Sequence, residues 1–145
     1  MSFIVLYIIL YKTNIMITES RHQSLKEKYN PDGSLLRRQQ MRMLEILKEI
    51  DRICKKYGIQ YWLSSGTLIG AVRHGGFIPW DDDLDIEMMR DDYERLMEVL
   101  PSELPTTMAL QTHKTDPTYF FYYAKIRDRR SLLAEGHNYD RMWKE

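Results

Sequence analysis

The feature that most constrains this chain is a glycine-rich stretch that is followed closely by a cluster of aspartates. The stretch SSGTLIGAVRHGG occupies residues 64–76, and the aspartates stand in WDDDLDI at residues 80–86. Glycine lets the backbone approach a ligand closely, and neighbouring carboxylates repel one another unless a cation relieves the repulsion. Together the two segments predict a site that holds a phosphate chain and a divalent cation.

The size and charge of the chain exclude several classes of protein. Its 145 residues correspond to one domain, and 21 basic side chains balance 21 acidic ones. The chain as a whole therefore lacks the basic surface that nucleic-acid binding requires, and no nucleic-acid partner is predicted. Cys54 is the single cysteine, which excludes an internal disulfide and a zinc site built from cysteines. We expect Cys54 to be a core residue, which is compatible with a reducing cytoplasm.

Residues 1–33 are interpreted as a partly disordered N-terminal extension, and residues 34–145 as the folded domain. An apolar run at residues 3–11 is much shorter than the ~20 residues that cross a bilayer. It also lacks the basic leader of a signal peptide. The run is therefore predicted to be a loose extension or a strand docked on a neighbour, and a segment that touches a membrane is the alternative.

Hydrophobic periodicity predicts a long helix that starts near Ser34 and ends at Gly58. Asp32 or Ser34 is suited to cap the start, and Gly58 is suited to the left-handed residue after the end. Six side chains form the apolar stripe of this helix: Leu36, Met43, Leu47, Ile50, Cys54 and Tyr57. We expect the stripe to face the core.

The remaining elements are predicted to be short. The patterns indicate strands at residues 59–63, 84–88, 108–111 and 119–126, and helices at residues 67–73 and 91–100. Pro101 is expected to stop the second of these helices. Helices and strands mixed in this order indicate an α/β or α+β domain.

The turn before residue 67 has the features of a phosphate site. N–H groups at the start of a helix attract anions, and Gly66 lets the backbone come close to a ligand. Ser65 and Thr67 add hydroxyl donors, and Arg73 could pair with a phosphate. A serine or threonine that caps a structural helix gives the same pattern, so this alternative stays open. A Walker loop is excluded, because no Gly-Lys-Ser/Thr sequence follows.

Asp83 and Asp85 are the candidate metal ligands. Residues two apart in a strand share a face, so both side chains would point the same way if Asp83 lies at the start of the strand. Mg²⁺ prefers oxygen ligands and usually takes one or two carboxylates together with substrate phosphates. An acidic turn in solvent is the alternative, above all for Asp81 and Asp82. A calcium loop is disfavoured, because Ile86 stands where its glycine is required.

Residues 65–86, with the sequence SGTLIGAVRHGGFIPWDDDLDI, resemble the signature of the LicD family of phosphotransferases. The segments at residues 61–63 and 125–128 support the resemblance. It implies a nucleotidyltransferase-like fold, a mixed sheet flanked by helices. It also implies transfer of phosphocholine, or a similar phospho-alcohol, from a CDP-activated donor to a cell-surface glycan. Animal relatives of this family, the fukutin group, transfer ribitol phosphate.

The resemblance also implies roles for individual residues. Gly66 and Thr67 would belong to the phosphate turn, Asp83 and Asp85 would hold Mg²⁺ or Mn²⁺, and Asp81 would be a supporting carboxylate. The enzyme would meet a nucleotide-activated small molecule and a glycan, in the cytoplasm or peripherally at the inner face of the membrane. Family members continue beyond the point that matches residue 145, into a further strand with a third carboxylate. We therefore expect this chain to correspond to the N-terminal part of such an enzyme.

Two other functions are compatible with the same residues. One is a nucleotidyltransferase that acts on a small molecule, which would release pyrophosphate where the phosphotransferase releases CMP. The other is a binding or regulatory remnant without turnover. The sequence does not identify the acceptor, the transferred alcohol or the oligomeric state.

Overall fold

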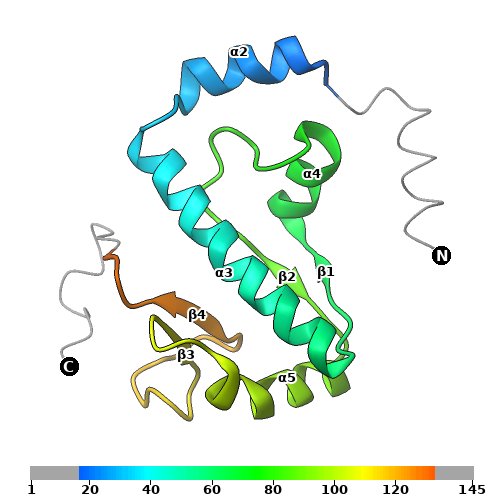
Figure 1. Ribbon diagram of the computed structural model, residues 1–145, viewed down its shortest axis with the longest axis vertical. Helices are drawn as coiled ribbons and strands as arrows, with labels where there is room; N and C mark the ends of the chain where they lie inside the picture. The colour runs from blue at the N-terminus through cyan, green and yellow to red at the C-terminus, as the bar shows by residue number, and fades with distance from the viewer. Residues whose placement is uncertain (1–16, 133–145) are drawn as a thin grey trace. The chain divides into compact units, whose positions relative to one another are not determined.

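The computed structural model describes residues 17–132 of the chain. The chain divides into two compact units, Met1–Glu98 and Val99–Glu145. The apolar run at residues 3–11 and the chain beyond residue 132 lie outside the described residues. The helices and strands of both units are labelled in Figure 1.

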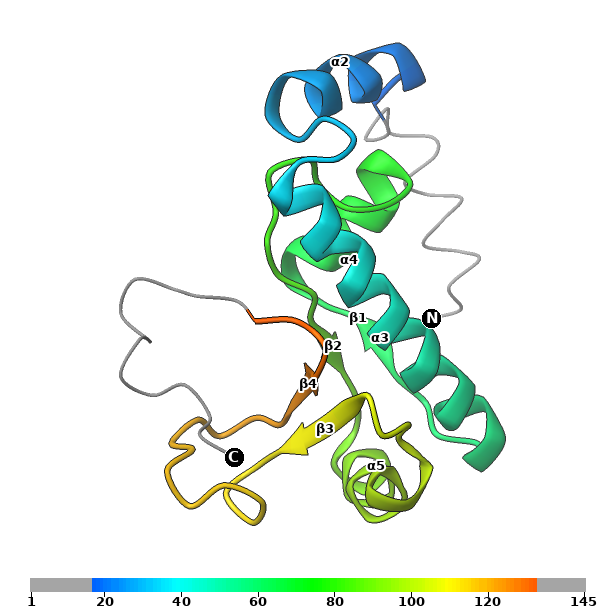
Figure 2. The ribbon, with the colours of Figure 1, turned by 60° about the vertical axis from the view of Figure 1, so that its left-hand side comes forward.

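The first unit is built on a long helix, α3 (Leu35–Tyr57), which confirms the helix predicted from the apolar stripe. Ser34 caps its start, because the Ser34 side chain accepts a hydrogen bond from the backbone N–H of Arg37. Gly58 follows its end with a φ of 63°, the left-handed conformation that glycine adopts without strain. In Figures 1 and 2, α3 runs alongside the short strands of this unit.

The core of the first unit lies along the second half of α3. Its most buried apolar side chains belong to Ile50, Ile53, Cys54, Ile59 and Leu96. Cys54 is 1% exposed, so the prediction of a core residue is confirmed. Burial raises the pKa of its thiol to about 11.

A second helix, α2 (Glu19–Tyr29), lies within the segment that was interpreted as an extension. Thr18 caps α2, and no residue of this helix is buried. Two contacts join α2 and the residue before its cap to the end of the helix formed by the glycine-rich stretch. The backbone N–H of Ile17 donates to the carbonyl of Arg73 (3.1 Å), and the ring of His22 meets the ring of His74.

As predicted, a strand precedes the glycine-rich stretch and a helix forms within it, although the strands are shorter than expected. β1 (Trp62–Leu63) pairs antiparallel with β2 (Ile86–Glu87), and α4 (Ser65–His74) follows β1 directly. The left-handed Gly75 ends α4. Alternation marks which side chains share a face, but the length of a strand depends on its partner. That partner is only two residues long here.

The second unit contains β3 (Met108–Gln111) and β4 (Lys125–Asp128), which pair antiparallel (Figure 2). β3 has the predicted bounds. The strand predicted at residues 119–126 was wrong over most of its length, because residues 119–124 form no strand. Their rings contact one another instead, as Tyr119 and Phe121 do at 5.5 Å between centroids.

The boundary between the units falls within α5 (Arg90–Glu103), which was predicted to stop at Pro101. That prediction was wrong, because the helix continues through Pro101 to Glu103. A proline removes one backbone donor, which near the end of a helix affects only the last turn. Here the N–H of Leu104 still donates to the carbonyl of Leu100 (3.0 Å).

The prediction of a mixed α/β fold is confirmed. Among the described residues the strands form two separate antiparallel pairs, where the resemblance implied one mixed sheet. Within this range, no helix is both long enough and apolar enough to cross a membrane.

Candidate phosphate and metal site

The glycine turn and the aspartate cluster lie against each other in the first unit. A Cβ atom placed on Gly66 would stand 2.7 Å from Oδ2 of Asp81, closer than real Cβ contacts occur. Only glycine therefore fits at this position while the Asp81 carboxylate keeps its place. The start of α4 and the acidic segment therefore lie side by side, as a shared site would require.

Three carboxylates gather at this site. One oxygen each of Asp81, Asp82 and Asp83 lies within 4.8 Å of the others, with Asp81 half-buried and the other two exposed. Negative charges this close repel one another, and a divalent cation relieves the repulsion. An all-oxygen donor set of this kind suits Mg²⁺ or another hard cation. The group therefore fits the metal that the resemblance implies.

Asp85 does not belong to this group of three. Its backbone is held at both ends: the N–H donates to Oγ1 of Thr67 (2.9 Å), and the carbonyl accepts from the N–H of Ser64 (3.1 Å). Asp83 and Asp85 were predicted to share a face if Asp83 lay at the start of the strand, and this condition is not met, because β2 begins only at Ile86. The two-residue alternation therefore does not set the directions of these carboxylates, and their roles as ligands stay a prediction.

The turn at the start of α4 differs from an ordinary helix cap. Ser64 occupies the cap position, but its side chain makes no capping bond and donates instead to Oε1 of Glu87 (2.7 Å). The exposed Ser65 has a φ of 48°, a left-handed conformation that is rare outside glycine. Strained backbone of this kind persists where the surroundings hold it and is concentrated at functional sites. The alternative of a serine-capped structural helix is therefore weakened.

The other two residues predicted to bind phosphate have different positions. Thr67 is buried, and its hydroxyl oxygen accepts from Asp85, which leaves the hydroxyl proton as its donor. Arg73 stands in the last turn of α4, seven residues after Gly66 and thus about 10 Å along the helix axis. The structure brings Gly66 and Asp81 together, but it places Arg73 at the opposite end of α4.

The sequence of the chain matches that of known proteins over this site. Residues 58–135 match the family described as LicD/FKTN/FKRP, nucleotidyltransferase domain, over more than half of the chain. The chain belongs to the LicD family. The match contains Ser65, Gly66, Thr67 and the aspartates of the site.

Individual relatives agree with the family match. The lipopolysaccharide cholinephosphotransferase LicD of Haemophilus influenzae is 55% identical over 102 residues, which cover 70% of this chain and 38% of the relative. The uncharacterized protein RP689 of Rickettsia prowazekii is 36% identical over 64% of the chain and 35% of its own length. The human ribitol 5-phosphate transferase FKRP is 42% identical over 34% of the chain and 11% of its own length. No solved structure matches significantly.

This LicD-family chain thus spans well under half the length of these relatives.

Two residues that position its site were not predicted from the sequence. Glu87 accepts from Ser64 and from Nε1 of Trp62 (3.2 Å), and its signal was the alternation with Asp85. Gln40 is 1% exposed and donates to the carbonyls of Ile78 (3.1 Å) and Asp81 (2.8 Å). Its signal was a polar residue at a stripe position of α3.

Proposed function

We propose that this chain carries the donor-binding site of a LicD-type phosphotransferase. The donor would be a CDP-activated phospho-alcohol, phosphocholine above all, and the acceptor a hydroxyl group of a cell-surface glycan. The observation that carries the proposal is the contact of Gly66 with Asp81, which joins a phosphate-type turn to a group of three carboxylates. The names of the bacterial and human relatives support the class of reaction.

In the proposed reaction, the acceptor oxygen attacks the phosphorus next to the alcohol. A new P–O bond forms, the bond to the CMP oxygen breaks, and the hydroxyl proton passes to a carboxylate of the site. The backbone N–H groups at the start of α4 and the Ser65 hydroxyl would bind the diphosphate oxygens. Asp81 and Asp83 would hold the Mg²⁺ or Mn²⁺ ion, with Asp82 or Asp85 as the further carboxylate. When bound, the ion would neutralise charge on the transferring phosphoryl group.

Binding is the first experiment, because the chain spans 38% of the length of the Haemophilus relative. Calorimetric titration with CDP-choline is carried out with Mg²⁺ and with EDTA. We expect affinity that needs the metal and that falls at least about tenfold, as for the loss of one charge-assisted contact, in Asp81→Asn and Asp83→Asn. Asp91→Asn is the matched control, because Asp91 is an exposed carboxylate in the first turn of α5. Equal, metal-independent titrations of all four proteins would refute the proposal.

Asp85→Asn decides which carboxylates act together. Loss of metal-dependent binding in this variant would favour the pair Asp83 and Asp85, and retention would favour the group of Asp81, Asp82 and Asp83.

Product analysis then separates the two enzyme classes. Release of CMP supports the phosphotransferase, and release of pyrophosphate from a nucleoside triphosphate would replace it with the nucleotidyltransferase.

A further inference from the structure

A second polar site lies in the first unit, apart from the carboxylates. It is a cavity of about 120 Å³, far above the ~10–15 Å³ that one water needs. α2, the start of α3 and the segment after α4 provide its walls. The lining residues are His22, Lys26, Asn30, Arg37, Gln40, His74, Gly75, Gly76, Phe77 and Pro79. We refer to it as the basic pocket.

The lining of the basic pocket carries positive charge and no carboxylate. Lys26 and Arg37 are cations at neutral pH, and His22 and His74 are further donors when protonated. One carboxylate approaches them from outside the lining: Oδ1 of Asp32 lies 2.8 Å from Nζ of Lys26 and 4.0 Å from Nε of Arg37. The Asp32 side chain is 77% exposed, so it is free to move away. The Asp32 carboxylate pairs with the two cations in the way that an anionic ligand would.

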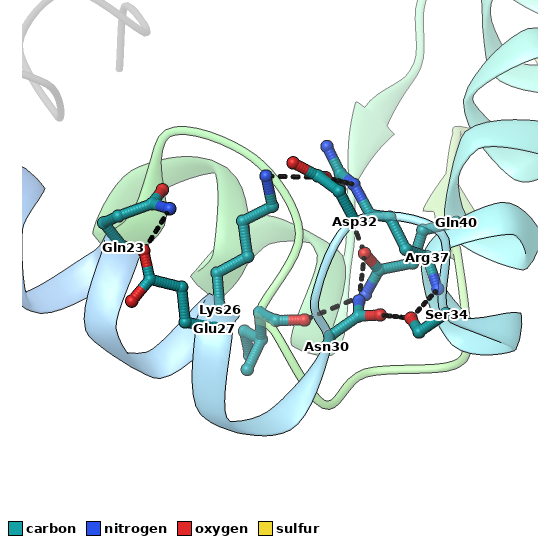
Figure 3. Close-up of polar contacts among 9 residues, drawn as sticks. Gln23, Lys26, Glu27, Asn30, Asp32, Ser34, Arg37 and Gln40 are labelled. Atoms are coloured by element: carbon teal, nitrogen blue, oxygen red, sulfur yellow. Dashed lines mark hydrogen bonds and ion pairs between the residues drawn. The ribbon is translucent and has the colours of Figure 1, made fainter.

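The wall behind these cations is a preformed network of neutral amides (Figure 3). Asn30 and Gln40 are each 1% exposed. Oε1 of Gln40 accepts from Nδ2 of Asn30 (2.9 Å) and from a guanidinium N–H of Arg37 (3.1 Å), and Ser34 donates to Asn30. The bond to Gln40 fixes the guanidinium of Arg37 and uses one of its five N–H donors. The cation is thus oriented before any ligand arrives.

The lining also contains a pair of imidazoles. Nδ1 of His22 and Nδ1 of His74 lie 3.1 Å apart, so one ring must donate and the other must accept. Two protonated rings would both present donors and repel each other at this distance. An anion beside them would remove that conflict by accepting from one or both. The pair therefore adds donors that respond to a negatively charged ligand.

We propose that the basic pocket binds a phosphate-type dianion, such as a phosphomonoester group, which displaces Asp32 from Lys26 and Arg37. A tetrahedral dianion offers several acceptors to two cations and two imidazoles, whereas the Asp32 carboxylate offers a single charge. The site is distinct from the glycine turn, but Gln40 connects the two: it lines the pocket and donates to the carbonyl of Asp81. The inference does not depend on the proposed function.

The test is a titration of the full chain with inorganic phosphate in EDTA, at low salt because salt screens such contacts. We expect saturable binding that weakens about tenfold or more in Lys26→Gln and in Arg37→Gln, and that Arg38→Gln leaves unchanged. Arg38 is an exposed arginine on the same helix and serves as the control. Thermal melting checks that each variant is folded.

Asp32→Asn gives a result of opposite sign. This exposed substitution removes the competing carboxylate, so phosphate should bind several-fold more tightly, as expected when a counterion is lost. Weaker or unchanged binding in Asp32→Asn, or equal affinity of the Lys26 and Arg37 variants with the unsubstituted chain, would overturn the proposal. Asp81→Asn should leave phosphate binding in EDTA intact, which separates this test from that of the donor site.

The source of the phosphate group is resolved in a second arm. Vesicles of phosphatidylcholine with phosphatidic acid are compared with phosphatidylcholine alone in a flotation assay. Binding to the acidic vesicles that Lys26→Gln abolishes assigns the pocket to a lipid headgroup. Binding of soluble phosphate without flotation assigns it to a soluble phosphomonoester. An absence of both kinds of binding refutes the site.

Discussion

The carboxylate group and the basic pocket share one segment of chain but are built in opposite ways. Gly75, Gly76, Phe77 and Pro79 line the pocket, and the aspartates follow directly after them. In the pocket, buried amides bond to one another and to the backbone. In the carboxylate group, side chains of one sign are crowded at the surface. The first arrangement is stable by itself, whereas the second is suited to receive a cation.

The comparison shows that the position of the segment at residues 76–83 and its expected metal binding depend on different residues. Its backbone is placed by contacts from elsewhere: Gln40 bonds to two of its carbonyls, and Gly70 of α4 lies against residues 76–78. Substitutions that alter the supports should therefore affect both sites, and substitutions at the aspartates should affect only one.

The largest effect is expected from Gly70→Ala. A Cβ atom at Gly70 would lie 2.5 Å from the carbonyl oxygen of Gly76 and 2.9 Å from the backbone N of Ile78. Backbone cannot step aside as a side chain can, so we expect the free energy of unfolding to fall by about 3 kcal/mol. Urea denaturation measures it. Gly76→Ala is the control, since a Cβ atom there meets nothing within 4 Å. Equal losses in the two variants would contradict this account of α4.

Gln40→Leu should give the next largest effect. It removes the partner of Asn30 and Arg37 and takes the Gln40 donor from the carbonyl of Asp81. The carbonyl of Ile78 also loses a bond but keeps the N–H of Asp81 (3.0 Å). A buried polar group that loses its partner costs about 1–3 kcal/mol, and we expect a total loss of about 2–3 kcal/mol in urea denaturation.

Gln39→Leu is the matched control for this substitution. Gln39 bonds to a single carbonyl, that of Asp82, at an exposed position, so its loss should stay below about 1 kcal/mol. Gln40→Leu should also weaken phosphate binding and Mg²⁺-dependent donor binding together. A variant that keeps both affinities would show that the two sites are positioned independently.

Gly66→Ala tests the carboxylate side alone. The three atoms nearest to the added Cβ all belong to the end of the Asp81 side chain, which can rotate away. The free energy of unfolding should change by less than about 1 kcal/mol. The affinity for Mn²⁺, followed by its electron spin resonance signal, should fall by about tenfold because one ligand is displaced. Unchanged Mn²⁺ affinity would remove Asp81 from the ligand set.

The sequence predicted those parts of the structure that local interactions determine. Helix α3 has the expected bounds because Ser34 caps it and Gly58 ends it within a few residues of chain. The direction of Asp83 could not be predicted, because the backbone before β2 is held by Gln40 and Thr67 from distant positions. Gln40 is a polar residue at a position of the apolar stripe, and this was the one indication in the sequence of a polar contact in the core.

The smallest effect is expected from pH and concerns the basic pocket. Partial burial, followed by the charges of His22 and Arg73, lowers the pKa of His74 below its ordinary value of 6.5. The folded chain then binds fewer protons than the unfolded chain just below pH 6.5, so this contribution to stability is complete above 6.5 and is lost as the pH falls below it. Urea denaturation between pH 7.5 and 5.5 should show the decline, and His74→Gln should reduce it while His113→Gln should not. Phosphate in the pocket would favour the protonated ring, so its addition should flatten the decline. A slope that is the same in His74→Gln would exclude His74 as its source.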